Sequence, residues 1–217
     1  MAIYLKKFET QAAYEAAESS LILPNVSLTV DNNTVHYNPS SPTPPTPVES
    51  VIIAKFQITS TSEPTMICSG SEYGEDYSSA FTSIEVDGVM LPTVSYLYQF
   101  DTLGEHTVKY TLADPTIISD SSFAYCSGLT SIDIPNSVTS INNTAFQQCE
   151  SLSSVTIGSG VTTIGSSSFE NCYSLTSINI PSGVTSIREG AFCNCDNLDA
   201  ASIAAIEAIG SRAFDCS

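Results

Sequence analysis

The chain has 217 residues, enough for one or two small domains, and its 23 acidic against 6 basic residues give a formal net charge of −17 at pH 7. This charge repels phosphate backbones and anionic lipid, so we expect no nucleic-acid partner. No run of 18 apolar residues occurs, so we expect no membrane insertion.

Residues 1–38 are predicted to form a small module of one helix and one β-hairpin. Thr10 can cap a helix over residues 11–19, which are rich in alanine. Apolar and polar residues then alternate over residues 26–30 and 35–37, and Asp31 begins a turn between these strands. An isolated hairpin is marginally stable in water. We therefore expect this module to anchor the chain on another protein, or on a second copy in a homo-oligomer.

The proline-rich residues 39–50 are predicted to be a semi-rigid linker, because proline favours an extended backbone. Residues 51–114 are predicted to form a small antiparallel β domain. Asp87 and Gly88 are a strong hairpin signal between strands at 84–86 and 89–91. Alternating apolar residues predict a second hairpin, with strands at 94–100 and 106–112.

From about residue 115 the chain repeats every 23 residues. Each repeat places one phenylalanine, one cysteine, one leucine and one isoleucine at fixed positions: Phe123, Phe146, Phe169 and Phe192; Cys126, Cys149, Cys172 and Cys195; Leu129, Leu152, Leu175 and Leu198; Ile118, Ile141, Ile164 and Ile187. A period in this range indicates a solenoid, whose units bury their apolar faces by stacking on one another. We expect two short β segments per coil, followed by a turn that contains the phenylalanine and the cysteine.

The four repeated cysteines are predicted to be buried thiols that pack as small apolar residues. Equivalent positions of stacked coils point their side chains in parallel, which suits a disulfide poorly. Cys193 is predicted to be incidental, because a zinc site with Cys195 would need two further ligands from other coils. The chain therefore predicts no metal and no cofactor.

The last repeat departs from the pattern, since Phe192 and Phe214 are 22 residues apart rather than 23. Residues 199–209 are rich in alanine. This repeat is either a terminal cap or the point at which a longer array is interrupted.

Catalysis is not predicted, because the two histidines, His36 and His106, match no triad motif and no phosphate-binding loop or metalloprotease motif occurs. Both histidines are expected to be structural. An acidic stretch at residues 72–76 could bind calcium, but it lacks EF-hand spacing, and a solvated loop is favoured.

The repeats from Ile118 to Phe214 resemble the BspA-like leucine-rich repeats of bacterial surface proteins. Residues 98–112 resemble the last hairpin of immunoglobulin-like and PKD-like surface domains. The stretches 4–10, 23–27 and 35–39 resemble leader modules of surface or virion proteins from gut bacteria and their phages. These resemblances imply a mainly β fold, with residues 1–38 as a helix–hairpin module, 39–50 as a linker, 51–114 as an Ig-like domain and 115–217 as a leucine-rich-repeat solenoid.

The BspA-like resemblance implies a non-enzymatic display or adhesion module that binds a host protein or glycan. The alternative is a structural virion component, a phage head or tail fibre, anchored to other virion proteins through residues 1–38. Either function implies an exterior-facing location. The first residues lack a secretory signal, so a signal was never needed or is missing from this sequence.

The candidate site is a stripe of short polar side chains that point outward from the first β segment of each coil. A solvated sheet face is the alternative, because the stripe has no Trp or Arg anchor. Two tyrosines in the phenylalanine–cysteine turns are expected to contribute at its rim. The stripe and rim residues are Ser131, Asp133, Ser154, Thr156, Ser177, Asn179, Tyr125 and Tyr173.

Overall fold

The computed structural model describes residues 28–31, 34–37, 51–69 and 77–216. The chain divides into two compact units, residues 1–48 and 49–217. In the first unit, β1 (Leu28–Asp31) pairs antiparallel with β2 (Thr34–Tyr37). The helix expected over residues 11–19 and the linker expected over 39–50 lie outside the described residues.

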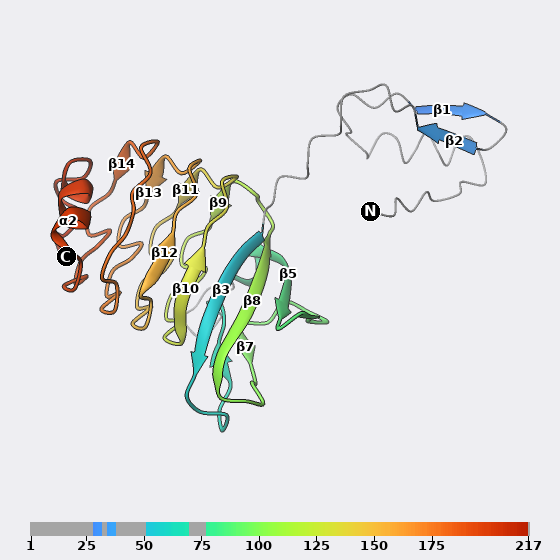
Figure 1. Ribbon diagram of the computed structural model, residues 1–217, viewed down its shortest axis with the longest axis horizontal. Coiled ribbons are helices and arrows are strands. Elements are labelled where there is room, and N and C mark those ends of the chain that lie inside the picture. Colours follow the sequence, from blue (N-terminus) through green and yellow to red (C-terminus); the bar gives the residue numbers. More distant parts are fainter. Residues whose placement is uncertain (1–27, 32–33, 38–50, 70–76, 217) are drawn as a thin grey trace. The chain divides into compact units, whose positions relative to one another are not determined.

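In the second unit, the described residues form a six-stranded sheet in the order β12-β10-β3-β8-β5-β6 (Figure 1). Its strands are β3 (Val51–Ile58), β5 (Phe81–Val86), β6 (Val89–Met90), β8 (Gly104–Leu112), β10 (Leu129–Asp133) and β12 (Ser154–Thr156). Every second residue of β3 and β8 is buried, as expected for strands with one face on a core. Because β3 pairs antiparallel with β10, one sheet continues from the region before the repeats into the repeats.

The turn between β5 and β6 confirms the predicted hairpin. Asp87 and Gly88 both have positive φ, 49° and 86°, and Val86 pairs with Val89. Positive φ at both central residues is the geometry that Asp-Gly favours in a two-residue hairpin. A short 3₁₀ helix, η2 (Tyr77–Ala80), leads into β5.

The second predicted hairpin is wrong. β7 (Leu97–Tyr98) pairs with β4 (Thr65–Met66) in a separate two-stranded sheet, whereas β8 lies between β3 and β5. The error arose because the alternating residues show which face of a strand is buried, but not which strand is its neighbour. The Ig-like assignment and the boundary at residue 114 stay predictions.

The repeats form a solenoid, as predicted. β9 (Ile117–Ile118), β11 (Ser140–Ile141), β13 (Thr163–Ile164) and β14 (Ser186–Ile187) pair in parallel, with partners one repeat apart (Figure 1). We call this the second ladder and the β10–β12 pair the first ladder. The turn between the second ladder and the next coil has two left-handed positions per repeat: Ser121, Thr144, Ser167 and Gly190; Tyr125, Gln148, Asn171 and Asn194.

The core of the solenoid is a column of stacked phenylalanine rings. Neighbouring rings from Phe123 to Phe192 have centroids 5.1–5.2 Å apart and planes within 14° of parallel. Tyr110 of β8 meets Phe123 edge-on at 5.0 Å, and its hydroxyl donates to the carbonyl of Ile67. The column therefore continues into the region before the repeats, which shares its core with the solenoid.

The prediction for the four repeated cysteines is confirmed, because Cys126, Cys149, Cys172 and Cys195 are buried and free. Three of them also donate from Sγ to the carbonyl of the phenylalanine 26 residues earlier, at 3.1–3.3 Å. Burial raises the pKa of Cys195 to about 12 and the pKa values of the other three thiols well above their usual range. All four are therefore packing residues that stay protonated at neutral pH.

The prediction that Cys193 is incidental is wrong, since it forms a disulfide with Cys216. The argument against disulfides assumes that side chains of neighbouring coils are parallel, and the aromatic side chains of the last two coils are not. The ring of Phe214 is tilted by 41° from that of Phe192, with centroids 6.2 Å apart. The Cα atoms of the two cysteines are 5.2 Å apart, within the range of ordinary disulfides.

The last coil also replaces its first β segment with a helix, α2 (Ala200–Glu207). Asp199 caps this helix by accepting a hydrogen bond from the backbone N–H of Ser202 at 2.8 Å. The hydroxyl of Ser202 accepts from the N–H of Ile178 and donates to its carbonyl, at 2.9 and 3.2 Å. The helix thus closes the polar backbone edge of the preceding coil.

One buried polar side chain in the core lacks a hydrogen bond. Ser168 is fully buried, and its hydroxyl has no hydrogen-bond partner within the described part of the chain. The equivalent positions one repeat away hold Ala145 and Ala191. We therefore expect Ser168→Ala to raise the free energy of unfolding by about 1 kcal/mol. Urea unfolding measures this, with Ala145→Ser as the reverse change that is expected to destabilise; a loss of stability in Ser168→Ala would contradict the assignment.

Candidate binding face

The first ladder brings together four of the predicted stripe residues. Ser131 pairs with Ser154, and Asp133 pairs with Thr156, in parallel register between β10 and β12. Between them, Ile132 and Val155 point into the core. Asp133, Ser154 and Thr156 are exposed and Ser131 is half-buried, so the outer face of this ladder is a flat array of hydroxyls and one carboxylate.

The stripe does not continue as a strand into the next coil. Ser177 and Asn179 are exposed at the equivalent positions, but they lie outside any strand, and β12 is the edge of the sheet. The backbone of Ile178 between them is bonded to Ser202 of α2 rather than to another strand. In place of the expected stripe, the structure has a ladder of two strands, β10 and β12. The segment with Ser177 and Asn179 follows outside the ladder, and α2 contacts its edge.

The two predicted rim tyrosines occupy different positions of the repeat. Tyr125 is 36% exposed and lies at a left-handed turn position, whose equivalents include Asn171. Tyr173 is 42% exposed, and its hydroxyl donates to Oδ1 of Asn171 at 3.1 Å. Tyr125 lies in the turn before β10 and Tyr173 in the turn before residues 175–180, two coils later, so they form no common aromatic patch.

Sequence reasoning missed the contribution of β3 to this face. In the β3–β10 register, Lys55 pairs with Ser131 and Ile53 pairs with Asp133. The Lys55 ammonium donates to Glu105 of β8 at 2.8 Å. This hydrogen bond raises the pKa of Lys55, and the negative charge of Asp133 adds to the effect. The alternation of residues 51–58 could have predicted a strand here, but no sequence signal names β10 as its partner.

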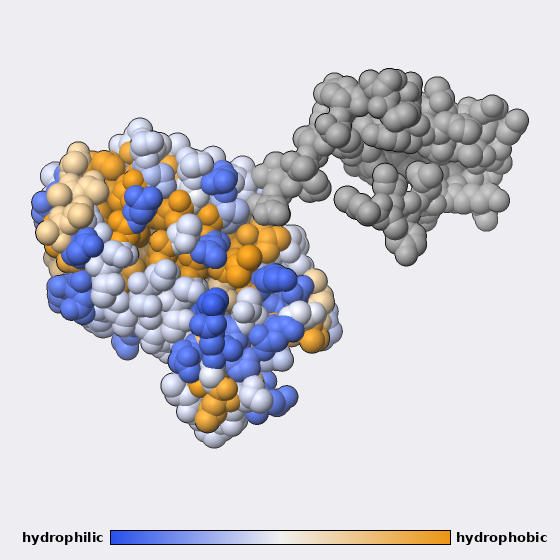
Figure 2. Space-filling view, in the orientation of Figure 1, coloured by the Kyte–Doolittle hydropathy of each residue, from blue (hydrophilic) through white to orange (hydrophobic). Residues whose placement is uncertain are grey.

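The outer surface changes in character across the sheet (Figure 2). In this view the area over β10 and β12 is pale and weakly polar, and strongly hydrophilic residues gather over β3 and β8. An apolar band crosses the repeats toward the second ladder. The first ladder is thus bordered by charge on one side and by apolar surface on the other.

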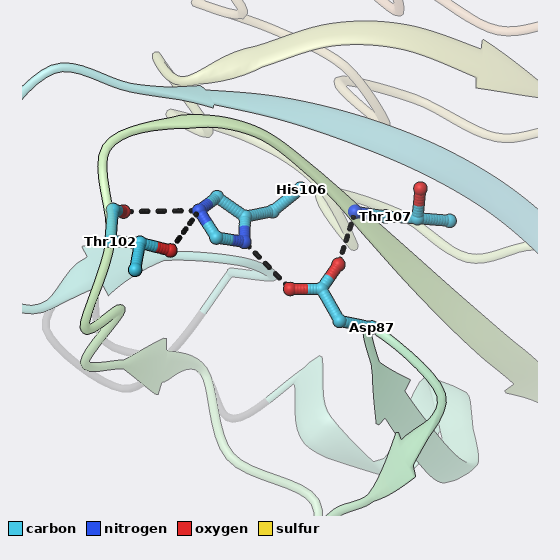
Figure 3. A network of polar contacts seen from close by, with 4 residues as sticks. All are labelled: Asp87, Thr102, His106 and Thr107. Atoms are coloured by element: carbon cyan, nitrogen blue, oxygen red, sulfur yellow. Dashed lines mark hydrogen bonds and ion pairs between the residues drawn. The ribbon is translucent and has the colours of Figure 1, made fainter.

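A second polar cluster links His106, Asp87, Thr102 and Thr107 at one end of β8 (Figure 3). Nδ1 of His106 is 2.6 Å from Oδ2 of Asp87, and Nε2 is 3.0 Å from the carbonyl and 3.3 Å from the hydroxyl of Thr102. The other oxygen of Asp87 accepts from the backbone N–H of Thr107. The order of hydroxyl, imidazole and carboxylate has the outline of a catalytic triad.

The polarity of these hydrogen bonds argues against a triad mechanism at this cluster. The carbonyl of Thr102 only accepts, so Nε2 must donate, and Nδ1 donates to the carboxylate of Asp87. A ring with both nitrogens protonated cannot take a proton from Thr102.

The hydrogen bond to Asp87 raises the pKa of His106 despite its burial. Burial opposes ionisation of Asp87, yet the bonds from His106 and Thr107 bring its pKa below the ordinary value. The cluster instead supports the structural role predicted for His106, as a clamp between the β5–β6 turn and β8.

The clamp predicts a pH dependence of stability. Because the folded pKa of His106 lies above its ordinary value of 6.5, its contribution is complete below pH 6.5 and is lost as the pH rises through the folded value. We expect the free energy of unfolding to fall over this window in the native chain but less in His106→Gln. Urea unfolding of both proteins between about pH 6 and about pH 9 measures the difference, in which the other titrating groups cancel. Parallel curves would contradict the clamp.

Across the described ranges no group of three or more His, Cys, Asp or Glu side chains could hold a metal ion. The acidic stretch at residues 72–76 lies outside those ranges. No helix in the part of the chain that the structure describes is long and apolar enough to cross a membrane.

The geometry of the repeats agrees with a known repeat family. Residues 116–217 match the BspA type leucine rich repeat region in six copies. The predicted resemblance of the repeats is therefore confirmed, for just under half of the chain. A comparison with curated proteins found no match.

Several solved structures of leucine-rich repeat proteins are similar to part of this chain. A leucine rich cell surface protein from Faecalibacterium prausnitzii is 38% identical over 39% of this chain and 22% of its own, with a TM-score of 0.38. The T. pallidum leucine rich repeat protein is 26% identical over 46% of this chain and 42% of its own, also with a TM-score of 0.38. A leucine-rich repeat protein from Bacteroides ovatus is 27% identical over 47% of this chain and 30% of its own, with a TM-score of 0.34. The matched region spans less than half the length of each of these proteins.

Proposed function

We propose that this chain is a non-enzymatic binding module, displayed on an exterior surface, which recognises a host protein or glycan through the outer face of the first ladder. The observation that supports it is the paired register of Ser131 with Ser154 and Asp133 with Thr156 on an open sheet face. Repeat scaffolds of this kind offer extended surfaces whose variable outward residues set the specificity.

The chemistry of the face favours a hydroxylated ligand. Its side chains are short and polar, and it has none of the Trp or Arg anchors that dominate protein interfaces. Serine and threonine hydroxyls both donate and accept hydrogen bonds, which suits the hydroxyl groups of a sugar. A glycan therefore fits the face better than a hydrophobic peptide does.

The disulfide supports an exterior location. Disulfides persist in oxidising environments and are rare where thiols are kept reduced. The Cys193–Cys216 bond joins two neighbouring coils of the repeat region.

Arrays of glycans and host proteins probed with the purified chain test the proposal. Thr156→Lys places a long charged side chain in the middle of the face, and Ser182→Lys makes the same type of change in an exposed turn between the ladders. Among the neutral glycans and host proteins of the arrays, we expect the native chain and Ser182→Lys to bind the same members, and Thr156→Lys to lose them. No signal from these members with the native chain, or unchanged binding of them by Thr156→Lys, would overturn the proposal.

A further inference from the structure

A hollow of about 440 Å³ lies at the far end of the second ladder, away from the proposed binding face. Its lining comes from the end of β14, from the turn after β13 and from the last coil: Ser166, Ile187, Arg188, Glu189, Ile209, Gly210, Ser211 and Arg212. β14 is the edge of its sheet, because the last coil adds no strand to it. The hollow therefore occupies the place where the array departs from its 23-residue register.

The two arginines in the lining of this hollow differ in whether they form an ion pair. Among the described lysines and arginines, Lys55, Lys109 and Arg212 each pair with a carboxylate, whereas Arg188 pairs with none. Glu189, the carboxylate in the lining, pairs with Arg212, which also bonds Asp215 at 3.0 Å. Arg188 is exposed, and the carboxylate beside it is already engaged. Among the described cations, Arg188 is therefore the one whose charge is open to an incoming anion.

The lining combines three kinds of recognition. A guanidinium binds a carboxylate through two parallel hydrogen bonds, with both charge and direction. The hydroxyls of Ser166 and Ser211 can donate to or accept from ligand hydroxyls. Ile187 and Ile209 supply an apolar wall, against which the C–H face of a sugar ring can pack. The hollow is wide open to solvent, so a ligand would lie across it rather than be enclosed by it.

We propose that this hollow binds the carboxylated sugar unit of an acidic glycan, with Arg188 as the residue that holds the carboxylate. The overall negative charge of the chain disfavours a densely sulfated or phosphorylated polymer, so single carboxylates spaced along a neutral glycan fit best. The site uses none of the stripe residues, so it stands independently of the first-ladder face.

An NMR titration of the full chain tests this site with two matched probes. Methyl β-glucuronide and methyl β-glucoside differ only in the carboxylate at carbon 6. We expect the glucuronide to shift the amide signals of Ser166, Arg188 and Ser211 saturably, and the glucoside to bind at least about tenfold more weakly. Equal binding of the two sugars, or no saturable shift with the glucuronide, would overturn the proposal. Acetate as a third probe separates a sugar site from a bare carboxylate site, and acetate binding as strongly as the glucuronide would also overturn it.

Two variants of equal charge change complete the experiment. Arg188→Gln is expected to weaken glucuronide binding about tenfold or more, whereas Lys109→Gln, on β8, should leave it unchanged. Both residues are exposed, so both variants should fold, which their melting curves verify. Glucuronide binding by Arg188→Gln at native strength would refute the role of Arg188. Thr156→Lys should keep glucuronide binding, so failure of this proposal and failure of the first-ladder proposal give different results.

Discussion

Phe169→Ala is expected to lower the free energy of unfolding by about 3–5 kcal/mol, the usual cost of emptying a large aromatic site in a core. The ring of Phe169 is fully buried and stacks between Phe146 at 5.1 Å and Phe192 at 5.2 Å. Both neighbouring coils hold the cavity open, because their backbones are joined to the coil of Phe169 by hydrogen bonds. Phe146 donates its N–H to Ser168, and Phe169 donates its own to Ala191. Chemical denaturation measures the loss.

Phe214→Ala is the matched control for this prediction. Phe214 ends the column, is only half-buried and is tilted against Phe192. Its removal should therefore cost clearly less than removal of Phe169, since the transfer and cavity contributions are both smaller. Equal losses from the two variants would show that the column does not hold the coils together as described.

Cys216→Ser is expected to cost about 3 kcal/mol, the typical contribution of a disulfide that closes a loop of this length. The bond joins residues 23 apart and connects the last coil to the one before it. The last coil lacks a strand in either ladder. Apart from the disulfide, it is held by backbone bonds from Gly190 and Phe192 and by the bonds of Ser202. Hydrogen exchange should rise first in residues 209–216 when the bond is absent. Thermal melting of oxidised protein, with and without a reductant, gives the size of the effect.

The reductant supplies the control. It should destabilise the native chain and leave Cys216→Ser unchanged, because Cys68, Cys126, Cys149, Cys172 and Cys195 have no disulfide to lose. The raised pKa values of Cys126, Cys149, Cys172 and Cys195 should also keep these four thiols unreactive toward alkylation until the protein unfolds. An unchanged melting temperature of the native chain in reductant would contradict the disulfide.

Much of the solenoid could be predicted from the repeat because one physical requirement acts on every coil. A position that faces the core of one coil faces it in all of them, so Phe146, Cys149 and Leu152 identify their equivalents throughout. The outward positions follow from the alternation of each β segment, which is why Ser131, Asp133, Ser154 and Thr156 were predicted as exposed neighbours on one face.

The remainder depends on contacts that leave no periodic signal. The antiparallel pairing of β3 with β10 joins residues more than 70 positions apart, and alternation alone is consistent with many partners. It places Lys55 and Ile53 beside the candidate face. The disulfide left no distinguishing signal either, since Cys193 and Cys216 are one repeat apart, as are the four buried cysteines that stay free.

The departure of Ser177 and Asn179 from the ladder has a local cause at the end of the array. The alanine-rich residues 200–207 favour helix, and alanine is a poor strand former. The backbone of Ile178, between Ser177 and Asn179, is therefore bonded to Ser202 rather than to another strand. Departures of this kind occur where a repeat ends, because a terminal unit has no neighbour on one side.

The most direct test of the central claim is hydrogen exchange of the full chain with and without the neutral glycan or host protein that the arrays select. If the outer face of the first ladder is the binding site, protection on binding will rise over Ser131–Asp133 and Ser154–Thr156, and this change will be absent in Thr156→Lys. Protection that lies elsewhere on the chain and leaves both strands unchanged would contradict the account.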